Sequence, residues 1–417
     1  MEEKEKAIIV GVNINYDDFE SSMIELKELA YACDIEVVGK ITQNLHEINR
    51  AMYVGTGKVD EIKNIAFRVG ANIVIFNDEL LPSQLRNLQK ELNIPILDRT
   101  SLILEIFARR ARSKEAKLQV EIAKLKYMLP RLVGLHSSLG RQGGGSGISN
   151  KGSGEKKLEL DKRKIEDEIT RLNKELKEIE LERKIRRRQR ENSNIPLVSL
   201  AGYTNAGKST LMNAFIDMYN GDETKKVEEK DMLFATLDTS VRKITLEDNK
   251  QFLLSDTVGF ISKLPHNLVK AFRSTLEEII YSDLIIHVVD YSDKNYLNHI
   301  EVTNKTLKEL GVEDTPIIYV YNKSDLVDRK IPFRDNNIIY MSASNKIGID
   351  ELKDLIKENI MNDYVKAKFL IPFSDGNIIS DLKNNATILC IDYNDKGTEI
   401  EVECKNSDYN KYKKYLV

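Results

Sequence analysis

The segment from Gly202 to Ser209 has the sequence GYTNAGKS and matches the pattern G-x-x-x-x-G-K-[ST]. An apolar run at 195–200 precedes it and predicts a strand, and a helical pattern follows it. A strand, this loop and a helix in that order form a P-loop, in which backbone N–H groups surround phosphate oxygens. The lysine then reaches the terminal phosphates, and the serine hydroxyl is placed to ligate Mg²⁺. The chain is therefore expected to contain a parallel α/β domain. The residues predicted to surround the phosphates are Gly202, Tyr203, Thr204, Asn205, Ala206, Gly207, Lys208, Ser209 and Thr210.

A second motif, Asn322-Lys323-Ser324-Asp325, follows the apolar run at 317–321. The Asp325 carboxylate only accepts hydrogen bonds, so it suits the two adjacent N–H donors of guanine, whereas adenine presents an unprotonated ring nitrogen there. By itself such a tetrapeptide is most often a surface turn. Behind a P-loop it predicts that the nucleotide is GTP or GDP. Asn322 and Lys323 would brace the loop, and the segment Ser342, Ala343 and Ser344 would add a backbone donor to the guanine carbonyl.

Two further segments carry the groups expected around the γ-phosphate. Asp256 ends an apolar run at 252–254 and supplies a carboxylate for Mg²⁺, and Gly259 supplies an N–H for the γ-phosphate. Thr236 supplies a third Mg²⁺ ligand, so Ser209, Thr236 and Asp256 form the predicted metal set, and Lys208, Thr236 and Gly259 the catalytic set. Loss of the γ-phosphate would release both segments, which are predicted to act as switches. The remaining residues of the predicted site are Phe234, Ala235, Leu237, Asp238, Thr257 and Val258.

Phe260 follows Gly259 at the position where many GTPases carry the glutamine that orients the attacking water. We therefore predict slow intrinsic hydrolysis. Another segment, a partner or an ion must supply the missing group. The Asn205 carbonyl is a candidate ligand for K⁺ beside the phosphates, where positive charge stabilises the transition state. The alternative, that Asn205 only braces the loop, is equally open.

Four regions follow from the pattern along the chain. Residues 1–112 alternate apolar runs with helical segments and predict a small parallel α/β domain. Residues 113–193 carry leucine and isoleucine at coiled-coil spacing on both sides of a glycine-rich stretch at 134–154, which predicts a helical hairpin with a flexible tip loop. The P-loop domain is expected over 194–361, and a small α+β domain over 362–417.

Composition excludes several classes of protein. Net charge is −3 and 31% of residues are charged, so a polyanion site must be a local cluster. Six of the eight residues from Arg183 to Arg190 are Lys or Arg, a density that suits RNA phosphates but also a solvated helix end. The three cysteines show no metal or disulfide spacing, and no apolar run reaches the ~18 residues of a membrane span. We expect a cytoplasmic protein without integral membrane association.

Taken together, these motifs resemble the HflX family of ribosome-associated GTPases. The similar segments are GYTNAGKST at 202–210, LFATLD at 233–238, DTVGF at 256–260, LPHNLVKAFRSTLEE at 264–278 and NKSD at 322–325. Ahead of them stand YVGTGKV at 53–59, NDELLPSQLRNL at 77–88, LDRTSLILEIFARRA at 97–111 and KLQVEIAKLKYMLPRL at 117–132. The hairpin with a glycine-rich tip is also the layout of that family.

The resemblance implies binding to the large ribosomal subunit and its rRNA rather than to DNA, with GTP favouring dissociation of stalled or idle ribosomes. We expect a monomer. The chain departs from the family pattern at Thr239, where a proline is usual, and at 152–156, where GSGEK replaces GPGET. Because the tip loop would lie among rRNA near antibiotic sites, both a housekeeping role and a resistance role remain open.

Two other functions fit the same motifs. A signalling GTPase could use the hairpin seam to hold a protein partner. A nucleotide-gated binding module without hydrolysis is a third reading, which Phe260 favours and the full set Lys208, Ser209, Thr236 and Asp256 opposes.

Overall fold

The computed structural model describes residues 5–14, 18–132, 149–191, 195–219, 232–234, 237, 239–265, 268 and 273–417. The chain packs into two compact units, and each is described by itself. The first comprises Met1–Arg188 with the two segments Lys230–Asp238 and Val258–Thr275, and the second comprises the rest. The segments predicted as switches thus pack mainly with the N-terminal part of the chain.

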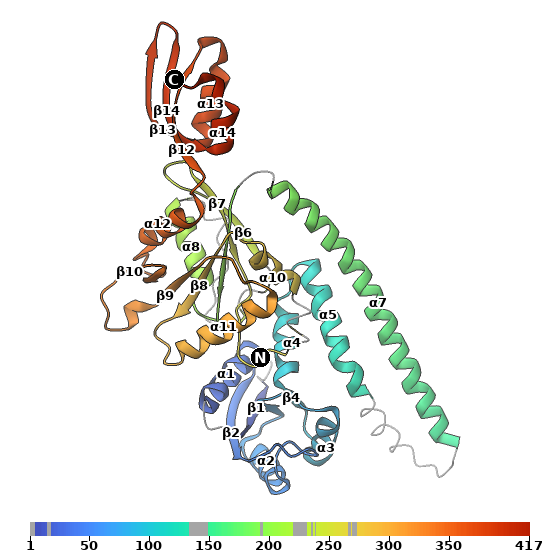
Figure 1. The fold of residues 1–417 in the computed structure, drawn as a ribbon. Coiled ribbons are helices and arrows are strands. Elements are labelled where there is room, and N and C mark those ends of the chain that lie inside the picture. The colour runs from blue at the N-terminus through green and yellow to red at the C-terminus, as the bar shows by residue number, and fades with distance from the viewer. Residues whose placement is uncertain are drawn as a thin grey trace. The chain divides into compact units, whose positions relative to one another are not determined.

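The N-terminal domain is a four-stranded parallel sheet in the order β2-β1-β3-β4 (Figure 1). Two pairs of helices, α1 with α4 and α2 with α3, pack against it. Right-handed crossovers place these pairs on opposite faces of the sheet. The strands β1, β3 and β4 match the apolar runs of the sequence at 7–12, 73–76 and 95–97, because a strand covered on both faces must be apolar throughout. The element bounds are β1 Lys6–Asn13, α1 Phe19–Ala32, β2 Glu36–Asn44, α2 Thr56–Val69, β3 Ile73–Phe76, α3 Pro82–Leu92, β4 Ile96–Asp98 and α4 Arg99–Arg110.

Two antiparallel helices follow, α5 Lys114–Met128 and α7 Ser149–Glu191, with a short 3₁₀ turn η1 Leu129–Arg131 after α5. Ion pairs Lys114–Glu175 at 3.9 Å and Arg183–Glu115 at 3.0 Å fix their register. The predicted tip loop at 134–154 is too long, because α7 already begins at Ser149. Gly152 and Gly154 each destabilise a helix by about 1 kcal/mol relative to alanine, and the strong helix formers that follow them outweigh this loss. Residues 134–148 of that loop lie outside the described residues.

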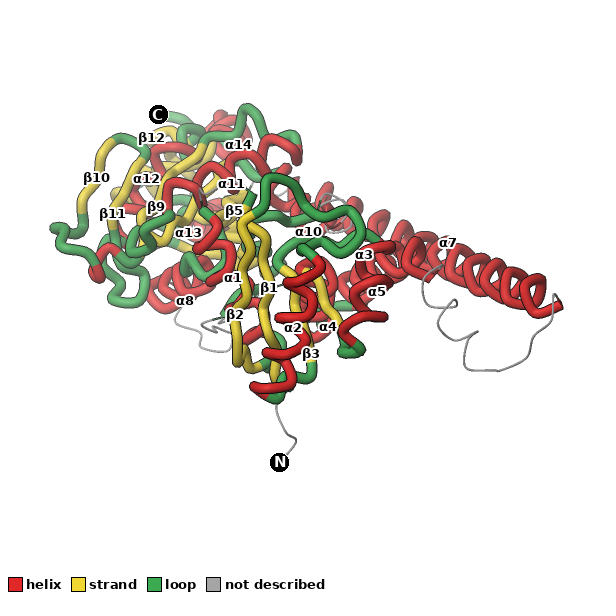
Figure 2. The backbone as a smooth tube through the Cα atoms, turned by 90° about the horizontal axis from the view of Figure 1, so that it is seen from below, coloured by secondary structure: helices red, strands yellow, loops and turns green. Residues whose placement is uncertain are grey.

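The P-loop domain contains a seven-stranded sheet in the order β10-β11-β9-β8-β5-β7-β6. Figure 2 labels β10, β11, β9 and β5 of this sheet. Its central strands β11, β9, β8, β5 and β7 run parallel. The sequence predicts them from the apolar runs at 338–341, 317–321, 284–289, 195–200 and 252–254. The antiparallel edge strands β6 and β10 were missed, because neither is a buried apolar run. The strands are β5 Leu197–Gly202, β6 Ser240–Thr245, β7 Gln251–Asp256, β8 Leu284–Asp290, β9 Ile317–Asn322, β10 Phe333–Asp335 and β11 Ile338–Tyr340. The helices are α8 Lys208–Tyr219, α10 Arg273–Ile280, α11 Tyr296–Leu310 and α12 Ile349–Ile360, with the 3₁₀ turn η3 Ser324–Leu326.

The C-terminal domain is an antiparallel sheet in the order β12-β14-β13 packed against α13 and α14. The sequence predicts strands at 387–392 and 399–404, which correspond to β13 and β14, and β12 is an additional strand. The bounds are β12 Tyr364–Ile371, α13 Gly376–Asn385, β13 Thr387–Asn394, β14 Gly397–Lys405 and α14 Asn406–Lys411, with 3₁₀ turns η4 Phe373–Asp375 and η5 Lys413–Tyr415. Among the helices of the described residues, none combines the length and apolar character needed to cross a membrane.

Candidate guanine-nucleotide site

The P-loop connects the end of β5 to the start of α8. Gly202 has φ +147° and Gly207 has φ +92°, values that side chains with a Cβ rarely adopt. A Cβ on Gly202 would lie 2.2 Å from the Val288 carbonyl oxygen, and one on Gly207 would lie 2.2 Å from Asn322 Nδ2. Gly202 is therefore required by a close backbone atom and Gly207 by a close side-chain atom, and both are required by their conformation.

Lys208 is the charged group inside this loop. Its side chain is buried, and Nζ donates hydrogen bonds to the carbonyl oxygens of Tyr203 at 2.7 Å and Gly202 at 3.1 Å. Burial lowers the pKa of Lys208 to about 8, although the Asp256 carboxylate acts in the opposite direction. The amine thus lies within the loop, where incoming phosphate oxygens can replace the carbonyls as acceptors.

Two of the three predicted metal ligands lie together beside the loop. Ser209 Oγ donates to Asp256 Oδ2 at 2.7 Å, and Asp256 is fully buried at the end of β7. The next residue, Thr257, donates from its hydroxyl to the Leu200 carbonyl at 2.7 Å, which fixes the end of β7 against β5. The third predicted ligand, Thr236, lies outside the described residues, as do Ala235 and Asp238.

Asn322 joins the P-loop to the two predicted base-reading loops. Its Nδ2 donates to the Ala206 carbonyl at 2.9 Å, and its Oδ1 accepts from the Ala343 backbone N–H at 2.9 Å. The side chain is buried. Segments that are far apart in sequence are therefore held around one point by a single amide.

Lys323 and Asp325 are oriented by partners that the sequence did not reveal. Lys323 has φ +59° and its Nζ pairs with Asp290 Oδ2 at 2.7 Å. Asp325 Oδ2 accepts from Asn345 Nδ2 at 3.0 Å, which orients the carboxylate predicted to read guanine. Asn345 directly follows Ser342, Ala343 and Ser344 in the chain. This position was the one feature of the sequence that could have indicated a role for Asn345 in the site.

A buried histidine lies beneath the loop but does not suit proton transfer at neutral pH. His287 on β8 pairs in register with Ala201 of β5. Burial, helped by the nearby Lys208 charge, lowers the pKa of His287 to about 3. The imidazole is therefore neutral and is part of the packed interior of the domain.

Both switch segments are anchored by apolar side chains in the first unit. Phe234 stacks edge-on with Phe107 of α4 at a ring-centroid distance of 4.6 Å. Leu233, Leu237 and Phe260 are likewise buried. The Phe260 side chain is thus in the interior.

Comparison with known proteins agrees with these motifs. Family models match residues 20–108 as a GTP-binding GTPase N-terminal domain, 110–190 as a GTP-binding GTPase middle region, and 197–323 as a 50S ribosome-binding GTPase. The GTPase HflX of Caldanaerobacter subterraneus subsp. tengcongensis is 45% identical over 96% of this chain and 91% of its own length. The Escherichia coli GTPase HflX is 36% identical over 90% and 88%.

Among solved structures, a GTP-binding protein from Sulfolobus solfataricus in complex with GDP aligns with 25% identity and a TM-score of 0.44, covering 86% of this chain and 99% of its own. The identity with the HflX relatives extends over nearly the whole chain, including the N-terminal region. The protein therefore belongs to the HflX family of GTPases.

Proposed function

We propose that this GTPase binds the large ribosomal subunit and couples GTP hydrolysis to the dissociation of stalled or idle ribosomes in the cytoplasm. The observation that carries the nucleotide part is the Asn322 amide, which joins the P-loop carbonyl of Ala206 to the N–H of Ala343. The ribosomal part is supported by the match of residues 197–323 to a 50S ribosome-binding GTPase. Rescue, recycling and antibiotic resistance are all compatible with this activity.

In the proposed site, Asp325 reads guanine and Lys208 binds the terminal phosphates. Mg²⁺ would be held by Ser209, Asp256 and Thr236. The residues present fit this ion, because a buried carboxylate and a hydroxyl 2.7 Å apart form a hard oxygen set. The ion would neutralise charge developing on the phosphates. Gly259 would donate its N–H to the γ-phosphate.

The group that replaces the usual glutamine is proposed to be K⁺ near Asn205. Asn205 has φ +60°, a conformation that asparagine tolerates better than most residues. Hydrolysis should then be faster in potassium than in sodium buffer.

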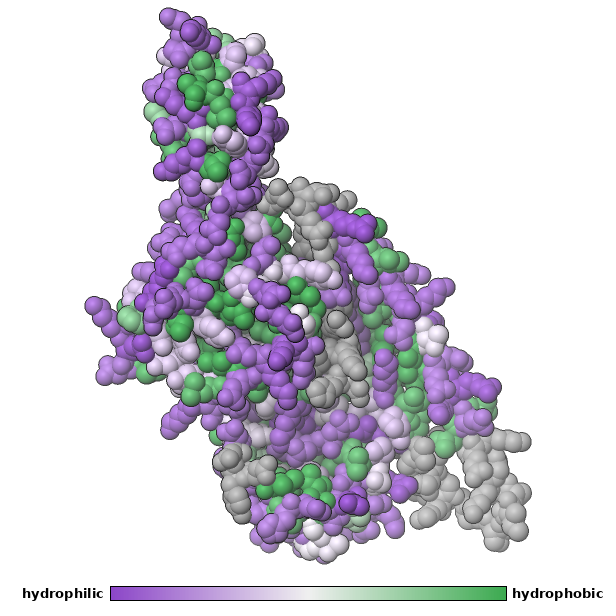
Figure 3. All heavy atoms as spheres, viewed as in Figure 1, coloured by the Kyte–Doolittle hydropathy of each residue, from purple (hydrophilic) through white to green (hydrophobic). Residues whose placement is uncertain are grey.

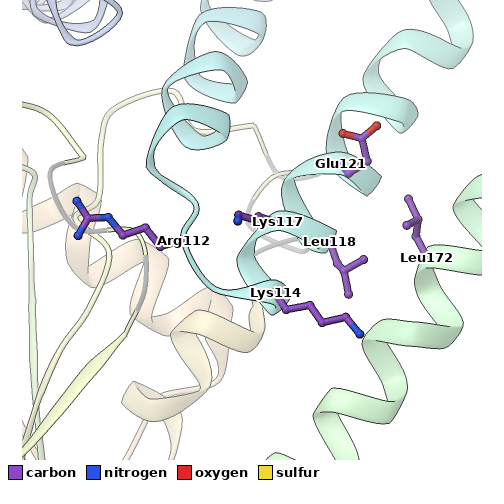
Figure 4. Close-up of a pocket in the computed structure, with 6 residues that line it drawn as sticks. All are labelled: Arg112, Lys114, Lys117, Leu118, Glu121 and Leu172. Carbon is purple, nitrogen blue, oxygen red and sulfur yellow. The ribbon is translucent and has the colours of Figure 1, made fainter.

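The helical hairpin is the proposed contact with rRNA. Arg112, Lys114 and Lys117 at the start of α5 line a hollow of about 560 Å³ that also includes Leu118, Glu121 and Leu172 (Figure 4). The basic run from Arg183 to Arg190 lies at the end of α7. Because the helices are antiparallel, the start of α5 and the end of α7 are neighbours. Arg183, Lys184 and Arg188 therefore fall at the same end of the hairpin as the cations of α5, and Arg183 pairs there with Glu115. Phosphates of a nucleic acid suit such a distribution.

The alternative is a signalling GTPase whose hairpin binds a protein. The observation in its favour is the exposure of Leu160, Leu181 and Ile185 on α7, and apolar patches interrupt the hydrophilic surface along this helix (Figure 3). A protein partner would cover them, whereas an RNA partner would not need them.

The deciding experiment measures GTP turnover by the full chain alone, with large subunits and with small subunits, in potassium and in sodium buffer. We expect stimulation by large subunits only, and we expect salt to weaken it. No stimulation by either subunit would contradict the ribosomal proposal and favour a protein partner. The sodium arm tests the cation separately.

The tip loop gives a second test of the same proposal. Deletion of residues 141–152 should leave intrinsic hydrolysis unchanged and remove subunit dissociation, measured by sedimentation. Dissociation at an unchanged rate would reduce this segment to a linker.

A further inference from the structure

Ser262 lies three residues after Gly259 and is held by side chains of the N-terminal domain. Its hydroxyl donates to the Glu25 carboxylate, and its backbone N–H approaches Glu25 Oε1 at 3.4 Å. Arg99 Nη2 donates to the Ser262 carbonyl oxygen at 3.2 Å and to Oγ at 3.1 Å. The carbonyl, the N–H and the hydroxyl of this one residue are thus all engaged by the same pair.

The pair that holds Ser262 is a buried ion pair. Arg99 is 1% exposed and Glu25 is 8% exposed, and Arg99 Nη2 also contacts Glu25 Oε2 directly. Arg99 Nη1 donates to Asn77 Oδ1 at 3.1 Å, and Asn77 Nδ2 donates to Ser22 Oγ at 2.9 Å. Charges removed from water in this way persist only when they are paired. Both Nη groups of Arg99 have partners, whereas its buried Nε has none among the described residues. The geometry of the network is therefore tightly determined.

The residues next to Ser262 are fixed as well. Phe260 and Ile261 are each 2% exposed. Lys263 has φ +52°, and its Nζ pairs with Asp78 Oδ1 at 2.6 Å. The segment from Phe260 to Lys263 is thus held by apolar contacts at its first two residues and by polar and ionic contacts at its last two, all within the first compact unit.

We propose that Arg99 and Glu25 are positioning residues for hydrolysis, which hold Ser262 so that Gly259 is ordered before GTP arrives. The inference rests on the proposed contact between the Gly259 N–H and the γ-phosphate. Fixing the backbone of one residue costs about 1–2 kcal/mol, so a segment already held binds the γ-phosphate more tightly by about tenfold. GDP lacks that phosphate and gains nothing from the ordering. The network thus contributes to the preference for GTP and to the rate of hydrolysis.

The test uses two variants of the full chain. Glu25→Leu with Arg99→Met removes both charges together, because a buried pair replaced by apolar side chains of similar volume often leaves stability unchanged. Ser262→Ala removes only the hydroxyl and keeps the ion pair. The matched control is Glu20→Gln. Glu20 lies on α1, as Glu25 does, and the substitution breaks its exposed ion pair with Lys40 of β2. Each is assayed for affinity to GDP and to a non-hydrolysable GTP analogue, and for kcat and KM.

We expect the double variant to bind the analogue about tenfold more weakly with unchanged GDP affinity, since only the γ-phosphate contact is affected. Its kcat should fall by a similar factor, Ser262→Ala should show a smaller effect of the same kind, and Glu20→Gln should match the parent. Equal losses for GDP and analogue, unchanged values, or tighter analogue binding would each overturn the proposal.

Gly259→Pro, which removes the backbone N–H, separates this inference from the assignment of the γ-phosphate contact to Gly259. If that variant still prefers the analogue as the parent does, the γ-phosphate contact of Gly259 is itself wrong. If it loses the preference while the double variant keeps it, only the positioning role of Arg99 and Glu25 is rejected.

Discussion

Replacing Asn322 by alanine should weaken GTP and GDP equally. The side chain makes two hydrogen bonds of 2.9 Å, one to the Ala206 carbonyl in the P-loop and one from the Ala343 N–H in the base-side loop. Asn322 is only 3% exposed, so water does not readily replace it. Both loops would lose the group that holds them together.

The magnitude follows from the two backbone groups left without a partner. Each buried group that loses its hydrogen bond costs about 1–3 kcal/mol, so the pair amounts to about 2–4 kcal/mol after partial relaxation. Because 1.4 kcal/mol corresponds to a factor of ten, nucleotide affinity should fall about thirtyfold to several hundredfold if the loops re-form on binding. Asn322→Asp keeps the acceptor for Ala343 but brings an oxygen against the Ala206 carbonyl, so it should also weaken binding.

The assay is titration with fluorescent GDP and with a non-hydrolysable GTP analogue, alongside urea unfolding of each variant. Asn304→Ala serves as a control, since it removes an asparagine of α11 in the same domain, whose Nδ2 donates to the Tyr319 hydroxyl at 3.4 Å. A loss below threefold would refute the bracing role. A loss confined to the GTP analogue would also refute it, because the two loops that Asn322 joins are predicted to hold parts of the nucleotide that GDP and GTP share.

Three further outcomes are expected. Burial lowers the pKa of Lys208 to about 8 without nucleotide, and bound phosphates favour the ammonium form. Above pH 8, GTP binding should therefore be accompanied by uptake of a proton, and GTP affinity should decline as pH rises. Equal GTP affinity at pH 7 and 9.5 would contradict this. Asp325→Asn should lower selectivity for guanine and admit xanthosine triphosphate, and continued rejection of that nucleotide at full GTP affinity would remove Asp325 from base recognition. Ser209→Ala should raise the Mg²⁺ concentration needed for half-maximal hydrolysis by about tenfold, the loss of one ligand bond, and an unchanged Mg²⁺ titration would exclude the hydroxyl as a ligand.

The motif residues were predictable because each is defined by local chemistry. Gly207 must adopt φ +92°, and Lys208 must follow it at the helix start, so the short sequence pattern carries the geometry. Asn345 and Asp290 were not predicted. They act by pairing with Asp325 and Lys323 across loops, and an asparagine or aspartate in a loop gives no signal of its partner.

The same distinction applies to the secondary structure. Buried parallel strands are apolar throughout and were recognised, whereas the edge strands β6 and β10 are partly exposed and lack that signature. The start of α7 at Ser149 was also missed. The local glycine content predicted a loop, but helix formation is cooperative, and the long helix that follows extends back through these glycines.

The sequence by itself determined the nucleotide chemistry, the α/β fold class and the family, because these depend on residues adjacent in the chain and on periodic burial. Only the tertiary structure decided where the switch segments are held. Arg99 and Ser262 are 163 positions apart, and Glu25 and Ser262 are 237 apart. Their pairing depends on how α1, α4 and the segment after β7 come together, and no local pattern encodes a contact between surfaces that form only on folding.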